Sequence, residues 1–212
     1  LFFDVFFDSV VTPDAIKALI NPNKSVLFFS SHGHHDHYNS RIFDVVKGLA
    51  PDKCTFILSD DIAWDAPMDG HEVRFVKSGG HYCIAGATKH EINIKTFDST
   101  DLGVAFHVDL GGCRIFHSGD LNWWHWENTT PDIQLEEARA FKSIMDLVVR
   151  EKINLAFVPL DPRLSSAAPY AFEYFLDASS ATHVVPIHFG EQFDTLKKIC
   201  NENQTIKAFK DA

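Results

Sequence analysis

Four side chains that can bind a metal stand within six positions, directly after an apolar segment that predicts a buried strand. The strand is expected at 25–29, and the polar run behind it has the pattern H-x-H-x-D-H, made by His32, His34, Asp36 and His37. Imidazole nitrogens and carboxylate oxygens are ligands for Zn²⁺, Fe²⁺ and Mn²⁺. A solvated polar loop is the alternative, but a turn is built from Gly, Asn or Asp and does not need so many imidazoles. The pattern therefore predicts a metal centre at the end of a buried strand.

The first part of the chain alternates between strand and helix. Apolar runs and helical spacing predict strands at 1–7, 25–29 and 55–58, and helices at 14–20 and 39–49. From residue 71 onward the pattern changes to near-period-two alternation with glycine pairs between the segments, which indicates a β-meander. Its strands are expected at 72–76, 91–97, 104–108 and 114–116.

The last part of the chain returns to longer helices and buried strands. A long amphipathic helix is predicted at 131–151, buried strands at 155–160 and 184–187, a helix at 193–201 and a short strand at 205–209. The sequence shows no repeat, low-complexity tract or linker. We therefore expect one domain over 1–212, an α/β unit in which helices cover two sheets.

The composition disfavours two classes of partner. The 212 residues include 19 basic and 29 acidic side chains, which give a formal net charge of −10. A surface that neutralises many phosphates is hard to build from this balance, so nucleic acid is a disfavoured partner. Bound divalent cations would offset part of the negative charge, so acidity fits a metalloprotein. No apolar run reaches the roughly 18 residues that a spanning helix needs, so we expect no membrane segment.

Cysteine usage and the start of the sequence bear on location. The four cysteines lie far apart without a C-x-x-C pair, which favours reduced thiols over a disulfide framework and predicts a cytoplasmic protein. The first residues lack the basic region and the small-residue cleavage site of a signal peptide. The sequence opens on Leu1 without an initiating Met, so we expect its start to be trimmed.

Two more strand ends carry residues that suit a metal. An apolar strand ends in Ser118-Gly119-Asp120, and His188 follows the strand expected at 184–187. Together with the H-x-H-x-D-H pattern, these segments resemble the metallo-β-lactamase superfamily of metallohydrolases. The Asp120 and His188 segments look more like the broad group that contains the ascorbate-6-phosphate lactonase-like proteins.

The resemblance implies a fold, a cofactor and a ligand set. The fold would be a four-layer αββα sandwich with mixed sheets and with one or two divalent metals between the sheet edges. Zinc is expected first, with manganese or iron as alternatives. His32 and His34 would bind the metal of site one, Asp36, His37 and His188 would bind that of site two, and Asp120 would bridge the two.

One motif of the family is missing from this sequence. Most members supply a third histidine to site one, and the corresponding stretch here, 96–103, contains none. Asp98 or Asp101 could replace it as an oxygen ligand, and His90 and His107 are weaker alternatives. Site one is therefore expected to hold an oxygen-bound metal, a weakly bound metal or none.

Several neighbouring residues have two possible roles. His117 is interpreted as an ordinary strand histidine rather than a group that contacts a ligand. Asp161 and Arg163 most simply form a turn, with a carboxylate behind a metal ligand and an anion clamp as the alternatives. Three tryptophans after Asp120 could wall a pocket or pack in the core: Trp123, Trp124 and Trp126.

These residues predict a metal-dependent hydrolase. A metal-bound hydroxide would attack an ester, lactone or phosphoester bond of a small molecule, and Asp36 or Asp120 would manage a proton. One alternative is a non-catalytic or mononuclear metal-binding protein of the same fold that senses a ligand. Another is a metal-dependent phosphodiesterase or nuclease. The expected partner is a small-molecule substrate, and the sequence selects no oligomeric state.

Overall fold

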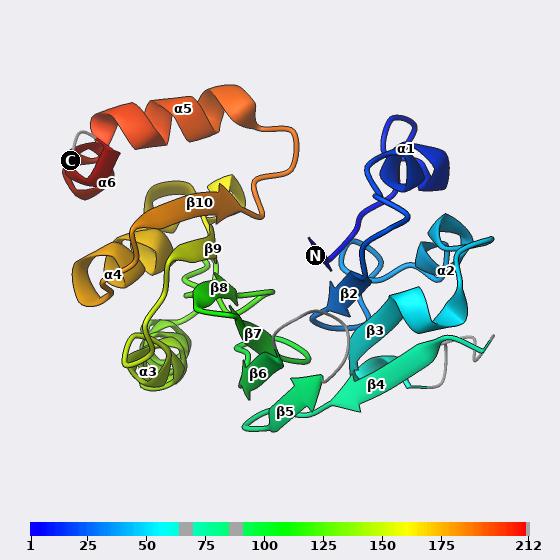
Figure 1. Ribbon diagram of the computed structural model, residues 1–212. Helices are drawn as coiled ribbons and strands as arrows, with labels where there is room; N and C mark the ends of the chain where they lie inside the picture. Colours follow the sequence, from blue (N-terminus) through cyan, green and yellow to red (C-terminus); the bar gives the residue numbers. More distant parts are fainter. Residues whose placement is uncertain (64–69, 85–90, 211–212) are drawn as a thin grey trace.

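Two sheets face each other in the computed structural model, which describes residues 1–63, 70–84 and 91–210 (Figure 1). The first sheet is parallel and has the order β1-β2-β3-β4. Its strands are β1 (Phe2–Phe3), β2 (Val26–Ser30), β3 (Cys54–Ser59) and β4 (Glu72–Val76). Parallel strands end at the same edge of their sheet, so the polar run after β2 lies along one edge.

The second sheet is mixed, in the order β10-β9-β8-β7-β6-β5. The strands β8, β9 and β10 run parallel, whereas β5 to β8 form an antiparallel meander. The strand at 72–76, which the alternation assigns to the same meander, is not part of it, because β4 pairs in parallel with β3 of the first sheet. The bounds are β5 (His81–Ile84), β6 (Ile92–Phe97), β7 (Ala105–Leu110), β8 (Cys113–His117), β9 (Leu155–Pro159) and β10 (His183–Ile187).

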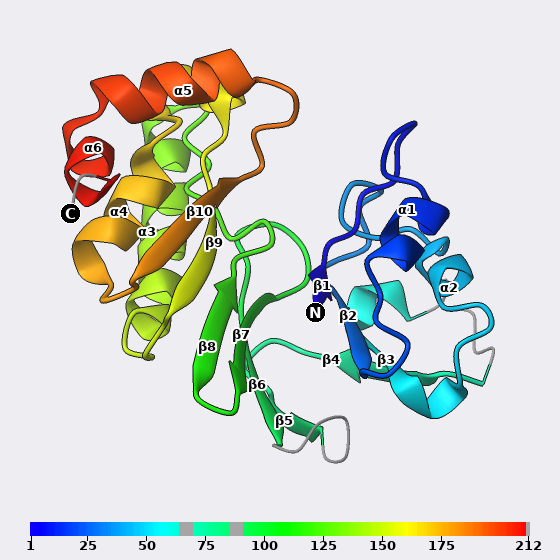
Figure 2. The same cartoon turned by 45° about the horizontal axis from the view of Figure 1, so that its top comes forward.

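Helices cover the outer sides of both sheets (Figures 1 and 2). The first sheet carries α1 (Pro13–Ala18) and α2 (Ile42–Val45). The second carries α3 (Pro131–Val148), α4 (Tyr170–Ala178), α5 (Phe193–Glu202) and α6 (Gln204–Lys210). This arrangement confirms the αββα sandwich. In the described part of the chain, no helix is both long and apolar enough to cross a membrane.

The apolar core lies in three layers because strand side chains alternate between the two faces of a sheet. On β2, Leu27 and Phe29 face the second sheet, where they meet Phe106, and Phe28 faces the helices of the first sheet. On the far side, Phe116 of β8 belongs to the cluster beneath α3 and α4. Strands buried on both faces explain the continuous apolar runs of the sequence.

Three predicted elements differ from the structure. The strand expected at 1–7 is only β1, because Asp4 adopts a φ of 44° that breaks the extended backbone. The helix expected at 39–49 is only the four-residue α2. The strand expected at 205–209 is wrong: it is helical α6, whose Ile206 N–H donates to Asn203 Oδ1 (3.0 Å). The sequence analysis missed β5 and α4.

Two glycines let separate loops close onto the residue before His32. Gly103 has a φ of +69°, and a Cβ atom there would lie 1.9 Å from the carbonyl oxygen of Ser31. Gly119 has a φ of +52°, and its Cβ would lie 2.6 Å from Cβ of Ser31. The loops before β7 and after β8 therefore pack against the end of β2, which brings Asp101 and Asp120 to the histidine run.

A methyl group at Gly103 should cost far more stability than one at a glycine with open space. Gly103→Ala is expected to lower the free energy of unfolding by about 3 kcal/mol or more, since a clash adds to the strained φ. Gly48, with a φ of +88° and no atom within 4 Å of its added Cβ, is the control. Gly48→Ala should cost about 1–2 kcal/mol from the backbone alone. Equal losses in urea unfolding would contradict this packing role.

Candidate metal centre

The first group of ligand-type side chains combines two histidines and two aspartates. His32, His34, Asp101 and Asp120 each offer an atom within 4.8 Å of the others. His32 Nε2 lies 2.9 Å from His34 Nδ1 and 3.7 Å from Asp120 Oδ2. His34 Nδ1 lies 3.7 Å from Asp101 Oδ2. The structure thus brings Asp101, rather than Asp98, to the side chains of the first group.

The second group lies on the other side of Asp120. Asp36, His37 and His188 offer atoms within 4.8 Å of one another. Asp36 Oδ2 is 3.6 Å from His37 Nε2. Asp120 Oδ1 is 3.1 Å from His37 Nε2 and 3.2 Å from His188 Nε2. One oxygen of Asp120 therefore faces each group.

The oxygen of Asp120 that faces the second group has no ordinary partner. Asp120 Oδ1 is buried and makes no hydrogen bond with any described residue, although His37 Nε2 and His188 Nε2 lie within 3.2 Å of it. A buried oxygen of this kind normally has a hydrogen-bond donor or a cation beside it. The unsatisfied oxygen and the surrounding nitrogen and oxygen donors fit a divalent metal such as zinc.

Asp4 contacts both ends of the segment 31–37, which carries the histidines, and so holds it in place. It accepts hydrogen bonds from Ser31 N and Ser31 Oγ, both at 2.7 Å, and it contacts His37 Nδ1 at 2.9 Å. The sequence analysis missed Asp4 and Ser31. A signal was present, because Asp4 is the one charged residue in the apolar run 1–7.

The network also fixes which ring nitrogen faces the centre. Ser31 Oγ–H donates to Asp4, so it accepts from His32 Nδ1 (3.0 Å) and leaves Nε2 free for a metal. Nδ1 of His37 likewise donates to Asp4, and Nδ1 of His188 donates to Asp161 Oδ2 (3.1 Å). Carboxylates behind histidines orient metal-binding imidazoles in this way and make them better ligands.

Asp161 is both a turn residue and a carboxylate behind a candidate metal ligand, the two roles that the sequence left open. Its side chain caps a 3₁₀ helix (Pro162–Ala167) by accepting from Arg163 N at 3.0 Å, as a turn residue would. The same carboxylate contacts His188 and takes hydrogen bonds from the Arg163 guanidinium. His188 itself has a φ of 63°, and Asp4 one of 44°. Such strained backbone persists where packing and hydrogen bonds hold it.

Electrostatics at the centre shift the pKa of several groups strongly. Burial alone would lower the pKa of His37, but Asp120 and Asp4 raise it to about 10. Burial also opposes the shift at His188, whose pKa Asp120 and Asp161 raise to about 9. Burial would raise the pKa of Asp120, whereas His188 and His37 hold it well below its usual range. A metal that binds these imidazoles must therefore displace protons.

The other candidates lie elsewhere. Asp98 lines a separate cavity beside α3, and His107 contacts the carbonyl oxygen of Lys152 (3.0 Å). His117 accepts from Gly119 N (3.1 Å), so it supports the loop that carries Asp120. His90 lies outside the described residues.

A pocket of about 550 Å³ opens beside both groups. Trp124 and Trp126 line it, whereas Trp123 stacks on Phe141 of α3 and is not among the lining residues. Glu137 of α3 also reaches the pocket and was missed by the sequence analysis, since nothing in the helical pattern distinguishes it from Glu136. The remaining lining residues include members of both metal-binding groups, namely His34, Asp36, Asp101, Asp120 and His188.

One of three comparisons with known proteins identifies the fold. No protein-family model and no curated protein matches the sequence. Among solved structures, the metallo-β-lactamase fold protein YhfI from Bacillus subtilis superposes with a TM-score of 0.53 and 11% identity, over 81% of this chain and 69% of that one. This chain therefore has the metallo-β-lactamase fold.

Two other solved structures are more distant in shape. A putative zinc-dependent hydrolase of the metallo-β-lactamase superfamily from Thermotoga maritima has a TM-score of 0.41 and 19% identity, over 84% of this chain and 72% of that one. Human tRNase Z, short form, has a TM-score of 0.46 and 11% identity, over 79% of this chain and 73% of that one.

Asp101 should be required for a second equivalent of metal. Asp101→Ala is expected to reduce the zinc content from two equivalents to one, because it removes one of the four donors of the first group. Asp98→Ala, three positions away and facing a different cavity, is the matched control and should keep both equivalents. Elemental analysis after dialysis measures the content. Two equivalents retained by Asp101→Ala would contradict the assignment.

Zinc binding should release protons from the two imidazoles with raised pKa. With pKa values of about 10 and about 9, His37 and His188 both carry an extra proton near neutral pH. Loading at about pH 7.5 should therefore release about two protons or more per chain, and affinity should rise with pH. Calorimetric titration in buffers of different ionisation enthalpy counts them. The variant His188→Ala should release about one proton fewer. A release of nearly zero protons by the unaltered protein would refute the prediction.

Proposed function

We propose that this protein is a metal-dependent hydrolase that cleaves an ester, lactone or phosphoester bond of a small molecule. The observation that carries the proposal is the position of Asp120, whose two oxygens face two separate groups of ligand-type side chains at the floor of an open pocket. When bound, divalent metals lower the pKa of water and polarise the oxygen of a substrate.

The chain's own residues would hold and shape this centre. Asp120 and the four histidines of the two groups would hold the metals, with Asp101 completing the first group and Asp36 the second. Asp4 and Asp161 keep the imidazoles oriented, so little reorganisation is needed when charge develops on a substrate. This pre-organised arrangement supports catalysis rather than a purely structural role.

Asp36 is suited to handle a proton next to the substrate. Its side chain is 46% exposed and lines the pocket, whereas that of Asp120 is 5% exposed. A general acid or base must reach the reacting group within hydrogen-bond distance. Asp36 therefore combines two roles in the proposal, ligand of the second group and acceptor of a proton from the attacking water.

Hydrolysis should depend on metal and on Asp120. The zinc-loaded protein is expected to cleave at least one of p-nitrophenyl acetate, γ-butyrolactone and bis(p-nitrophenyl) phosphate. Chelation or Asp120→Ala should lower the rate by about 100-fold or more, because each removes the stabilisation of the transition state. His183→Ala, which changes an exposed histidine of β10, should retain the rate.

Three outcomes of this experiment would overturn or narrow the hydrolase proposal. No cleavage of any probe with two equivalents of zinc bound would overturn the hydrolase proposal in favour of a ligand-sensing metal protein. Cleavage that survives chelation would show that the metal centre is not responsible. Cleavage of the phosphodiester alone would narrow the proposal to a phosphodiesterase.

A further inference from the structure

We propose that the substrate is a small organic anion, with its carboxylate or phosphate group held by Arg163 and its apolar part against Trp124 and Trp126. The inference rests on the hydrolase function proposed above and names the substrate class of the same pocket. It comes from three side chains that line that pocket and belong to neither metal-binding group, namely Arg163, Trp124 and Trp126.

Arg163 is held in place with part of its guanidinium free. Nε lies 3.0 Å from both carboxylate oxygens of Asp161, and Nη2 donates to Oδ2 at 2.6 Å. Nη1 makes no hydrogen bond with any residue that the structure describes, and the side chain is 53% exposed. Its two N–H groups are therefore available to a ligand, and a fixed guanidinium suits a carboxylate or phosphate.

Arg163 also lies beside the second metal-binding group. Its Nη2 is 3.3 Å from His188 Nδ1, and both residues line the pocket. A ligand held by Arg163 would therefore have its next atoms close to the position where a reacting bond must sit. This placement is what separates a substrate-binding arginine from one that only caps a turn.

Two tryptophans form an apolar surface next to this cation. The rings of Trp124 and Trp126 are parallel to within 2°, with their centroids 5.9 Å apart. Arg163 Cζ lies 5.9 Å from the Trp126 ring, and Trp124 meets His188 edge-on at 5.8 Å. Aromatic walls with one placed charge are typical of small-molecule sites. The pocket thus offers apolar contact and positive charge to the same ligand.

The charges around the pocket limit how many anionic groups it accepts. Two divalent cations would carry four positive charges, against three negative charges on Asp36, Asp101 and Asp120. The carboxylates of Asp4 and Asp161 lie behind the imidazoles and offset more of this positive charge. Glu137 lines the pocket as an additional carboxylate outside that set. A second anionic group near Glu137 would be repelled. The pocket therefore favours one anionic group, at the Arg163 end, over a long polyanion.

Binding of matched probes tests this inference without requiring turnover. The zinc-loaded protein is titrated with benzoate, phenylphosphonate and the neutral benzamide, and tryptophan fluorescence reports binding. Arg163→Gln should weaken the better-bound anion about tenfold, which is about 1.4 kcal/mol, and change benzamide binding less than about twofold. Which anion loses more distinguishes a carboxylate from a phosphate group as the natural ligand.

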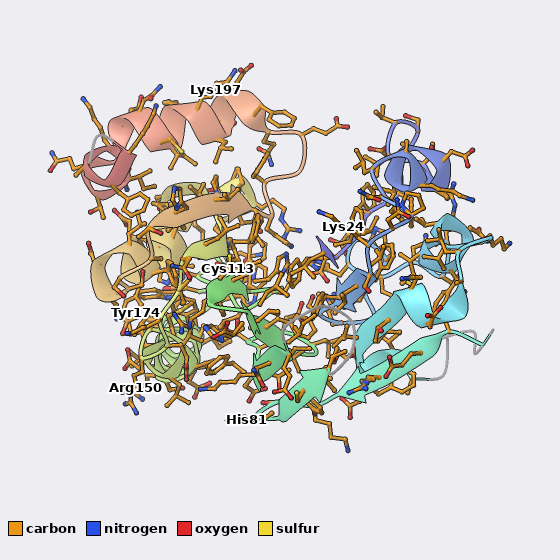
Figure 3. The ribbon with its side chains drawn as sticks, viewed as in Figure 1. Lys24, His81, Cys113, Arg150, Tyr174 and Lys197 are labelled. Atoms are coloured by element: carbon orange, nitrogen blue, oxygen red, sulfur yellow. The ribbon has the colours of Figure 1, made fainter. Side chains whose placement is uncertain are left out.

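Two further variants separate the effect of the Arg163 geometry from that of positive charge, and a zinc measurement controls for metal content. Arg163→Lys keeps the positive charge but not the two-pronged geometry of the guanidinium. Its affinity for the anion should therefore lie between that of the unaltered protein and that of Arg163→Gln. Arg150→Gln removes a positive charge just beyond the end of α3 (Figure 3), from a residue that lines a different cavity, and should change nothing. Zinc content is measured in every variant, so that only fully loaded proteins are compared.

The results separate this inference from the hydrolase proposal. Equal losses for anions and benzamide, or no loss in fully loaded Arg163→Gln, would overturn the inference even if the protein hydrolyses esters. A selective loss of anion binding in a protein that cleaves no probe would support the anion site and refute the hydrolase function.

Discussion

The carboxylate of Asp120 is the interaction on which the rest of the centre depends. Its two oxygens face the two groups, with Oδ2 toward His32 and Oδ1 toward His37 and His188. These residues come from the loops after β2, β8 and β10, which belong to two different sheets. Closing the sandwich is therefore what assembles the centre, and neither sheet contains it alone.

Packing and hydrogen bonds behind the ligands make that assembly rigid. Gly103 and Gly119 let two loops close onto Ser31, and Asp4 ties Ser31 to His37. On the opposite sheet Asp161 performs the same function for His188. A site held from behind in this way tolerates strained backbone at Asp4 and His188, because the surrounding contacts offset its cost.

Much of this could be predicted from the sequence, since the ligand types stand directly after buried apolar strands. The clustering of His32, His34, Asp36 and His37 needs no tertiary information, and the αββα fold is confirmed. Choosing Asp101 over Asp98 did require the structure, because it depends on how the loop before β7 packs on Ser31. Asp4 was missed because its partners lie 27 and 33 positions away. Residues 205–209 form part of helix α6 rather than the expected strand, because Asn203 accepts a hydrogen bond from the Ile206 N–H and caps a helix there.

Anomalous diffraction from crystals of the zinc-loaded protein would show whether Asp120 bridges two metals. We expect two zinc peaks about 3.5–4 Å apart. One should lie among His32, His34 and Asp101, the other among Asp36, His37 and His188, with one oxygen of Asp120 directed at each. A single peak, or two peaks that do not share Asp120, would contradict this bridging role.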